Sequence, residues 1–119
     1  MRYFWRAANL ARHSDHSLHK MGALLVRNGN VIGGGWNQNK THPRSKNRYR
    51  TIHAELAALI YAGRVEGYLG ADMYVVRITR GDSMATSKPC RDCMVLIKEA
   101  GIKSVTYIDD KGEIINERL

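Results

Sequence analysis

The chain has 119 residues, of which 44% are hydrophobic and 25% are charged, and it carries a formal net charge of +8. This length suits one domain (residues 1–119), and the balanced composition excludes wholly disordered and fibrous proteins. No apolar stretch approaches the roughly 20 residues that span a bilayer, and residues 1–15 lack the apolar core of a signal peptide. We therefore expect a soluble, cytoplasmic protein with no membrane partner, whose basic charge favours anionic partners such as phosphates or nucleic acid.

The first half of the chain predicts a helix, a hairpin and a second helix. Apolar residues at helical spacing predict an amphipathic helix over Tyr3–His13. Two apolar runs within residues 22–37 flank Asn28-Gly29, a strong hairpin signal, and predict two antiparallel strands. A polar loop containing a proline then leads to a helix over about Ile52–Ala62, with Gly63 as its stop.

The second half predicts a buried strand, a helix and a closing hairpin. Residues 72–79 are rich in β-branched and aromatic side chains, and Pro89–Gly101 begins with proline and ends with glycine as helices often do. Strands at residues 104–108 and 113–117 are joined by a link too short for a crossover, so they are antiparallel. The element order predicts a three-layer α/β/α fold with a mixed five-stranded sheet whose last two strands are antiparallel.

A cluster of cations precedes the second predicted helix. It is open to two interpretations, a solvated loop or a segment that faces phosphate, and its place beside the candidate chemistry slightly favours the second. Its members are Lys40, Arg44, Lys46, Arg48 and Arg50.

The only two cysteines, Cys90 and Cys93, lie three positions apart at the start of a predicted helix, where the helix dipole favours thiolates. Such a pair serves a metal site or a redox dithiol. His53 opens another helix, and a His, Cys, Cys set leaves the fourth position of a tetrahedral zinc open for water, as in catalytic sites. Glu55 is the carboxylate placed to accept a proton from that water.

Two other kinds of zinc site are disfavoured. The HExxH pattern of zinc peptidases is absent. A closed structural site needs a fourth donor, and the other histidines lack a regular ligand spacing, so we interpret them as surface residues. They are His13, His16, His19 and His42.

The segments His53-Ala54-Glu55 and Pro89-Cys90-Arg91-Asp92-Cys93 together resemble the H-x-E and P-C-x-x-C signature of the zinc-dependent cytidine and deoxycytidylate deaminase superfamily. The resemblance extends to the element order over nearly the whole chain, including Gly35–Asn37 and residues 101–108. It implies a cytidine deaminase-like fold and a homo-oligomer.

The resemblance implies an amidine hydrolase that releases ammonia from a cytosine nucleoside or nucleotide. Zinc held by His53, Cys90 and Cys93 would carry the hydroxide that attacks C4, with Glu55 as the proton shuttle. By the same resemblance, the backbone N–H of Ala54 would bind the base and Asn37 would contact the sugar.

The substrate is left open between cytidine, deoxycytidine and dCMP. An antiparallel final hairpin resembles free cytidine deaminases, whereas Lys40–Pro43 resembles deoxycytidylate deaminases. Cytosine-specific relatives commonly have Ser or Thr directly before Pro-Cys, but here Ser87 is followed by Lys88, which either points into solvent or reaches a substrate phosphate.

Two alternatives remain. The first is a deaminase acting on cytosine or adenine in single-stranded DNA or RNA, with Trp36 and Tyr49 either stacking on bases or packing. The second is a non-catalytic, zinc-stabilised nucleic-acid-binding module, which the presence of Glu55 argues against.

Overall fold

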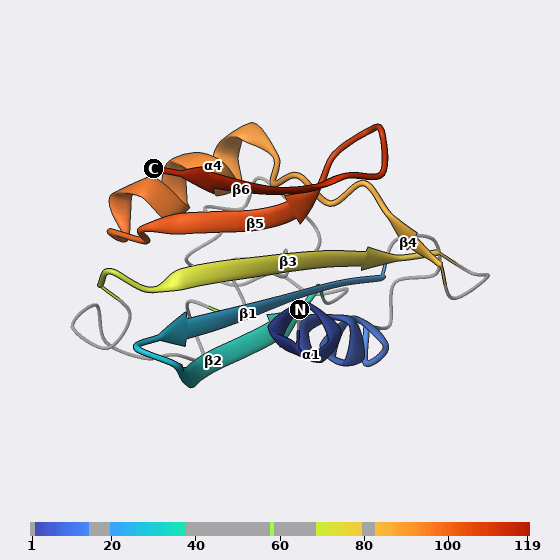
Figure 1. Cartoon of the computed structure of the whole chain (residues 1–119), viewed down its shortest axis with the longest axis horizontal. Helices are drawn as coiled ribbons and strands as arrows, with labels where there is room; N and C mark the ends of the chain where they lie inside the picture. The colour runs from blue at the N-terminus through green and yellow to red at the C-terminus, as the bar shows by residue number, and fades with distance from the viewer. Residues whose placement is uncertain (1, 15–19, 38–57, 59–68, 80–82) are drawn as a thin grey trace.

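A computed structural model describes residues 2–14, 20–37, 58, 69–79 and 83–119 (Figure 1). The predicted helix over 52–62 lies outside these residues except for Ala58, which is helical and fully buried. In the described ranges, no helix is long and apolar enough to cross a membrane. The helices and strands are α1 Arg2–Ala11, β1 Lys20–Arg27, β2 Asn30–Trp36, β3 Asp72–Ile78, β4 Met84–Ala85, α4 Arg91–Glu99, β5 Ser104–Ile108 and β6 Ile114–Arg118.

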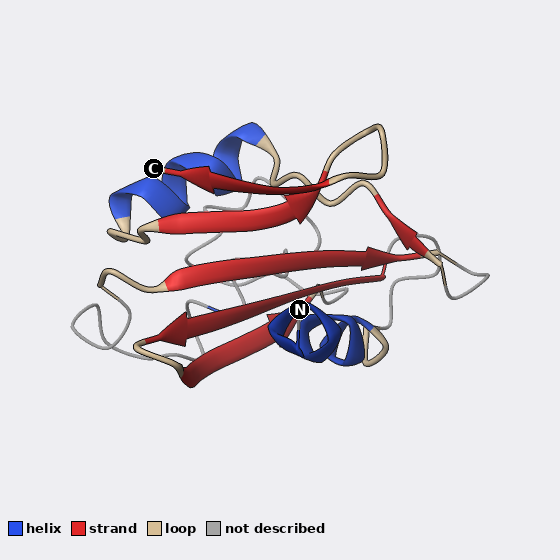
Figure 2. Ribbon diagram, viewed as in Figure 1, coloured by secondary structure: helices blue, strands red, loops and turns tan. Residues whose placement is uncertain are grey.

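The strands form one mixed sheet with the order β2-β1-β3-β5-β6, and β4 pairs with β3 (Figure 2). Strands β3 and β5 are parallel, whereas the other neighbours, including β5 and β6, are antiparallel. The five predicted strands and the antiparallel final pair are thus confirmed. The sixth strand, β4, was not predicted, because its two residues lie in a stretch whose composition is typical of a turn.

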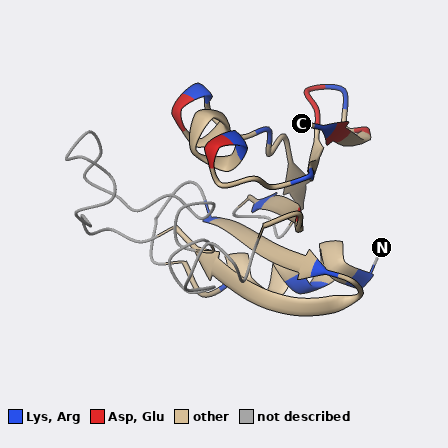
Figure 3. Ribbon diagram, turned by 90° about the vertical axis from the view of Figure 1, so that its left-hand side faces the viewer, with Lys and Arg blue, Asp and Glu red and all other residues tan. Residues whose placement is uncertain are grey.

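The described helices cover opposite faces of the sheet (Figures 1 and 3). Helix α1 buries an apolar face against β1 and β3, in a cluster that includes Phe4 and Val76. On the other face Ile97 of α4 packs in a second cluster that includes Val75 and Val105. Because successive residues of a strand point to opposite faces, β3 supplies both clusters, and the predicted three-layer arrangement follows.

The first hairpin and the end of α4 have the backbone conformations that the sequence predicted. Asn28 and Gly29 both have positive φ, 52° and 78°, as the type I′ turn of a two-residue hairpin requires. At the end of α4, Gly101 has φ 81°, its N–H donates to the carbonyl of Lys98, and the N–H of Ile102 donates to that of Ile97. These two bonds are the Schellman ending, which satisfies the last carbonyls of a helix.

Helix α1 lies unusually close to β1 at Gly22. A Cβ atom at this position would overlap with the carbonyl oxygen of Ala7 and would lie 2.6 Å from the backbone nitrogen of Ala11. Glycine therefore allows the helix backbone to rest directly on the strand.

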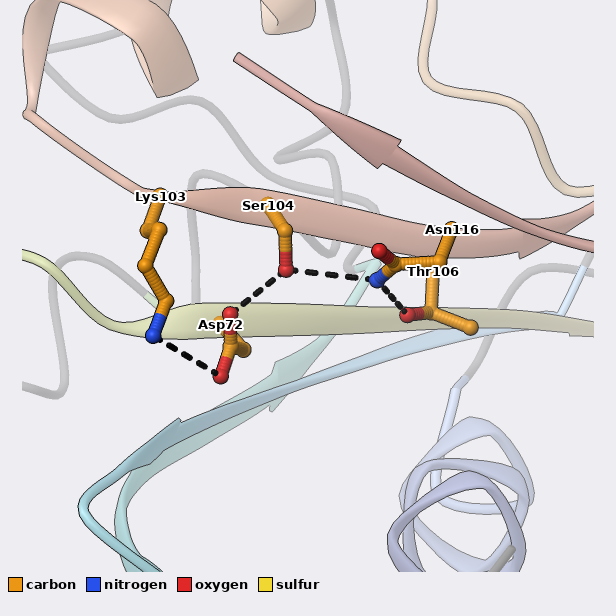
Figure 4. Close-up of polar contacts among 5 residues, drawn as sticks. All are labelled: Asp72, Lys103, Ser104, Thr106 and Asn116. Carbon is orange, nitrogen blue, oxygen red and sulfur yellow. Dashed lines mark hydrogen bonds and ion pairs between the residues drawn. The ribbon is translucent and has the colours of Figure 1, made fainter.

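A connected set of polar side chains lies on β3, β5 and β6, on the side of the sheet where α1 packs (Figure 4). The Ser104 hydroxyl donates to Asp72 at 2.5 Å, and the Asn116 amide donates to Ser104 at 3.3 Å and to Thr106 at 2.9 Å. Lys103 lies 3.9 Å from the Asp72 carboxylate. Ser104 and Thr106 are buried, so these bonds satisfy polar groups that have left water.

Candidate metal centre

Cys90 and Cys93 share the first turn of α4. Cys90 is the N-cap residue in an extended conformation, and its sulfur accepts a hydrogen bond from the Cys93 N–H at 3.4 Å. Cys90 is exposed and Cys93 is buried, and neither forms a disulfide. Pro89 precedes the N-cap, so the helix begins at Arg91, two residues later than the sequence predicted. The two sulfur donors are thereby presented at one helix end, as the spacing predicted.

The segment before Cys90 is hydrogen-bonded to both parallel strands, at the middle of β3 and at the carboxyl end of β5. Ser87 is almost fully buried, and its hydroxyl donates to the Val75 carbonyl of β3 at 2.8 Å. The same oxygen accepts the N–H of Ile108 in β5 at 2.9 Å, and the Ser87 N–H donates to the Ile108 carbonyl at 2.9 Å. The turn that carries the two cysteines therefore begins at a point held by both strands.

Asn37 follows β2 and is buried against β1. Its N–H donates to the Met21 carbonyl at 3.2 Å, and its side-chain oxygen accepts the Met21 N–H at 2.9 Å. The Ser14 hydroxyl donates to the Asn37 carbonyl at 3.0 Å. Asn37 thus continues the pairing of β1 with β2 by one residue, through its N–H and its side-chain oxygen. Its contact with a sugar remains a prediction.

Lys88 is exposed, and its ammonium lies 5.9 Å from the centre of the Tyr107 ring. The buried Tyr107 hydroxyl donates to Glu117 at 2.8 Å. Burial, and then the hydrogen bond and charge of Glu117, raise the pKa of Tyr107 above its usual value. Lys88 also borders an open groove of about 390 Å³ between α4 and β6, lined by Lys88, Pro89, Arg91, Met94, Val95, Lys98 and Glu117.

The remaining predicted site residues, His53, Ala54 and Glu55, lie outside the described residues, so their roles stay predictions. Among the described residues, no group of three or more His, Cys, Asp or Glu side chains is placed to hold a metal ion. The two cysteines of α4 are thus one part of the predicted ligand set. Their chemistry fits zinc, since thiolate sulfur and imidazole nitrogen are its common ligands.

Sequence reasoning missed two residues near this end of the sheet. Ser87 was noted only for its distance from Pro-Cys, and its burial between strands has no signal in sequence. Arg77 lies near the carboxyl end of β3, and in the described part of the chain its buried Nε atom has no hydrogen-bond partner. The signal that was available for Arg77 is a cation inside an apolar strand, which is rare unless it has a partner or a function.

Comparison with known proteins bears on this site. The family described as the cytidine and deoxycytidylate deaminase zinc-binding region matches residues 1–109. A protein of Mycobacterium phage D29 named deoxycytidylate deaminase is 31% identical over an aligned region that covers 85% of this chain and 87% of that protein.

Solved structures are similar over most of the chain. The apo dCMP deaminase of cyanophage S-TIM5 has a TM-score of 0.70 at 28% identity, covering 91% of this chain and 80% of its own. The structure of the cyanophage enzyme in complex with dCMP and dUMP has a TM-score of 0.62 at 26% identity, with coverages of 87% and 76%. A cytidine deaminase of Burkholderia pseudomallei has a TM-score of 0.71 at 23% identity, with coverages of 98% and 90%, and shares the fold. These likenesses confirm the predicted fold.

Proposed function

Because the chain belongs to the cytidine and deoxycytidylate deaminase family, we propose that it hydrolyses dCMP to dUMP and ammonia. The enzyme class, a cytidine/deoxycytidylate-type deaminase with Zn²⁺ as its cofactor, follows from the family match. The observation that carries the proposal is the Pro-Cys-x-x-Cys turn at the start of α4, which lies within the matched residues and holds both cysteines in one helical turn. The relative named deoxycytidylate deaminase supports the choice of a nucleotide.

The proposed zinc ligands are His53, Cys90 and Cys93. When bound, the zinc ion supplies Lewis-acid activation of water at neutral pH. The chain contributes the placement of these ligands: Cys90 caps α4, and Cys93 follows one turn later in a buried position.

Glu55 is the proposed proton carrier. It takes a proton from the attacking water and delivers it to N3 of the cytosine ring, then takes the remaining proton of the hydroxyl added at C4 and delivers it to the departing amino group. A C4–O bond forms and the C4–N bond breaks, so one water is consumed and one ammonia is released. The Ala54 N–H would orient the base and Asn37 the sugar.

The test is an assay of purified, zinc-loaded protein against dCMP, deoxycytidine, cytidine, CMP, adenosine, and single-stranded DNA and RNA. We expect dCMP to give the highest kcat/KM. Glu55→Gln, which keeps the size of the side chain, should lower kcat by about 100-fold or more with zinc retained. Full activity in this variant would contradict the mechanism, and a lack of deamination of every substrate by the wild type would favour the non-catalytic module.

Arg77 supports a substrate that carries phosphate. The Arg77 Nε atom is buried with no hydrogen-bond partner among the described residues; such a group is costly, and a bound anion would relieve that cost. Alternation along β3 places Arg77 on the same face as Met73 and Val75, which pack in the cluster containing Ile97 of α4. The carboxyl ends of parallel strands, where Arg77 lies, are where ligands bind in open α/β sheets.

Arg77→Gln should lower kcat/KM for dCMP by about 10- to 100-fold while leaving kcat/KM for deoxycytidine unchanged, since one charge-assisted hydrogen bond contributes a few kcal/mol. Arg27→Gln, at the other end of the sheet, is the matched control and should leave both unchanged. An equal loss for nucleotide and nucleoside would contradict a phosphate contact.

A second candidate, deamination of single-stranded nucleic acid, is favoured by the groove beside α4. Lys88, Arg91 and Lys98 line it together with apolar residues and Glu117, and the three cations suit a phosphate backbone. Figure 3 shows basic positions near both ends of α4, each beside an acidic one. If this candidate is correct, turnover is confined to polynucleotides and binding weakens steeply as salt rises from 50 to about 200 mM. Turnover of free dCMP would contradict it.

A further inference from the structure

Strands β3 and β5 separate after a short parallel ladder. Their parallel ladder pairs Asp72 with Ser104, Met73 with Val105 and Tyr74 with Thr106. Both strands continue beyond the ladder, β3 to Ile78 and β5 to Ile108. Beyond the ladder, the carbonyl of Val75 and the N–H and carbonyl of Ile108 lie in the core. They therefore need hydrogen-bond partners from another segment of the chain.

Ser87 provides these partners. One side-chain oxygen donates to the Val75 carbonyl and accepts the Ile108 N–H, and the Ser87 N–H donates to the Ile108 carbonyl. All three distances are 2.8 to 2.9 Å, and Ser87 is 1% exposed. Thr86 adds a bond from its hydroxyl to the Ile108 carbonyl at 3.2 Å. The chain before α4 is thus hydrogen-bonded to both strands.

Only Lys88 and Pro89 lie between Ser87 and Cys90. Pro89 is buried and its φ is fixed by its ring, so little freedom remains between the Ser87 hydroxyl and the first sulfur. We propose that Ser87 is a positioning residue for the metal-binding cysteines, acting through the backbone of residues 87–90. This inference rests on the proposed zinc site at Cys90 and Cys93.

The substitution Ser87→Ala can distinguish an effect on the position of the turn from an effect on the folding of the domain. Ser87→Ala removes both side-chain bonds but keeps the backbone bond to Ile108, so the turn remains attached and shifts toward one strand. A metal site senses such a shift, because loss of an outer partner that orients ligands typically weakens metal binding by about 10- to 100-fold.

Ser104→Ala is the matched control. Ser104 is also a buried serine whose hydroxyl is bonded on both sides, to Asp72 and Asn116, but it lies at the opposite end of β5 from Ile108 (Figure 4). A variant that weakens the metal site only by lowering global stability would act alike at both serines. A positioning role predicts an effect at Ser87 alone.

The experiment titrates the apo forms of wild type, Ser87→Ala and Ser104→Ala with Co²⁺ and Zn²⁺, following the visible absorption of thiolate-bound cobalt, with urea unfolding measured in parallel. We expect a metal affinity about 10-fold or more below wild type, with an altered cobalt spectrum, for Ser87→Ala alone. Wild-type affinity and spectrum in Ser87→Ala, or an equal loss in Ser104→Ala, would overturn the inference. A wild-type protein that binds neither metal would instead overturn the proposed zinc site itself.

If Ser87→Ala does not fold, Ser87→Thr carries the test. It keeps the hydroxyl but adds a methyl group to a side chain that is 1% exposed, so we expect it to displace the turn while the hydroxyl remains. A severalfold loss of Co²⁺ affinity with an altered cobalt spectrum and near-wild-type unfolding would support the inference, whereas wild-type affinity and spectrum would overturn it.

Discussion

At the scale of single residues, Cys90 has two tasks at the start of α4. Its sulfur accepts the Cys93 N–H, which belongs to the first turn of the helix, and the proposed function makes the same sulfur a zinc ligand. These tasks are separable by substitution, because serine is a good N-cap but a poor zinc ligand.

We predict that Cys90→Ser abolishes zinc binding and deaminase activity while keeping the apo protein as stable as the wild type. Cys90→Ala should lose the metal equally, with a free energy of unfolding about 1 kcal/mol below that of Cys90→Ser, since alanine provides no cap. Urea unfolding of the apo proteins and metal analysis check the two effects separately. Equal stability of the two variants would show that the cap contributes nothing.

Tyr107 yields a prediction about alkaline pH. Burial, followed by the bond to Glu117, raises the pKa of Tyr107, so in the folded protein the phenol keeps its proton at a higher pH than in the unfolded chain. Its contribution to stability is complete below about pH 10, where both states are protonated, and is lost as pH rises through the folded pKa.

Tyr107→Phe should therefore be less stable than the wild type by about 1 kcal/mol at pH 7, through loss of the hydrogen bond. The difference should shrink above about pH 10, where only the wild type has this phenol to ionise on unfolding. Urea unfolding at a series of pH values measures it. A difference that stays constant or grows through this range would contradict the raised pKa.

At the scale of elements, the contact of α1 with β1 depends on Gly22. The helix backbone lies so close that a methyl group at this position would meet the carbonyl of Ala7 and the backbone of Ala11, which cannot rotate away. At Gly34 of β2, a methyl group would meet only the end of the flexible Leu10 side chain, at 2.6 Å.

We predict that Gly22→Ala lowers the free energy of unfolding by about 1 to 3 kcal/mol, as overpacked cores do. Gly34→Ala serves as the control and should cost clearly less, since a side chain moves more easily than a helix. Thermal and urea unfolding give both values. A larger loss at Gly34 would contradict this account of the packing.

Elements whose signals are local could be predicted from the sequence. Asn28-Gly29 takes the two positive φ angles of a tight hairpin, and Gly101 takes the one that ends α4. The bonds of Ser87 could not be predicted, because Val75 and Ile108 lie 12 and 21 residues away and the sequence does not show which distant backbone groups a serine hydroxyl bonds. For the site, the pair of cysteines and their helix end were predictable from spacing.

At the scale of the whole molecule, a metal bound only by the folded state stabilises that state by mass action. The predicted ligands come from distant parts of the sequence, since His53 is far from Cys90 and Cys93, so an unfolded chain would bind zinc weakly. The homo-oligomer and the cytoplasmic location expected from sequence remain predictions.

Removal of zinc with a chelator should abolish deamination and lower the melting temperature. With free zinc at 100 times its Kd, the stabilisation lost is about 2.7 kcal/mol. Addition of zinc should restore both activity and melting temperature, and Mg²⁺, which prefers oxygen ligands, should restore neither. Full activity in a preparation shown to be metal-free would contradict the zinc assignment.

The polar side of the sheet at β3, β5 and β6 offers a position at which the protein can be attached to a surface. The only two cysteines are proposed metal ligands, so a thiol-reactive dye or linker would compete with zinc. Arg118 is exposed at the end of β6 and, by alternation from Asn116, lies on this polar side, away from the face packed by α4. An azide-bearing residue introduced there would tether the protein to a sensor chip with its α4 side turned toward the solution.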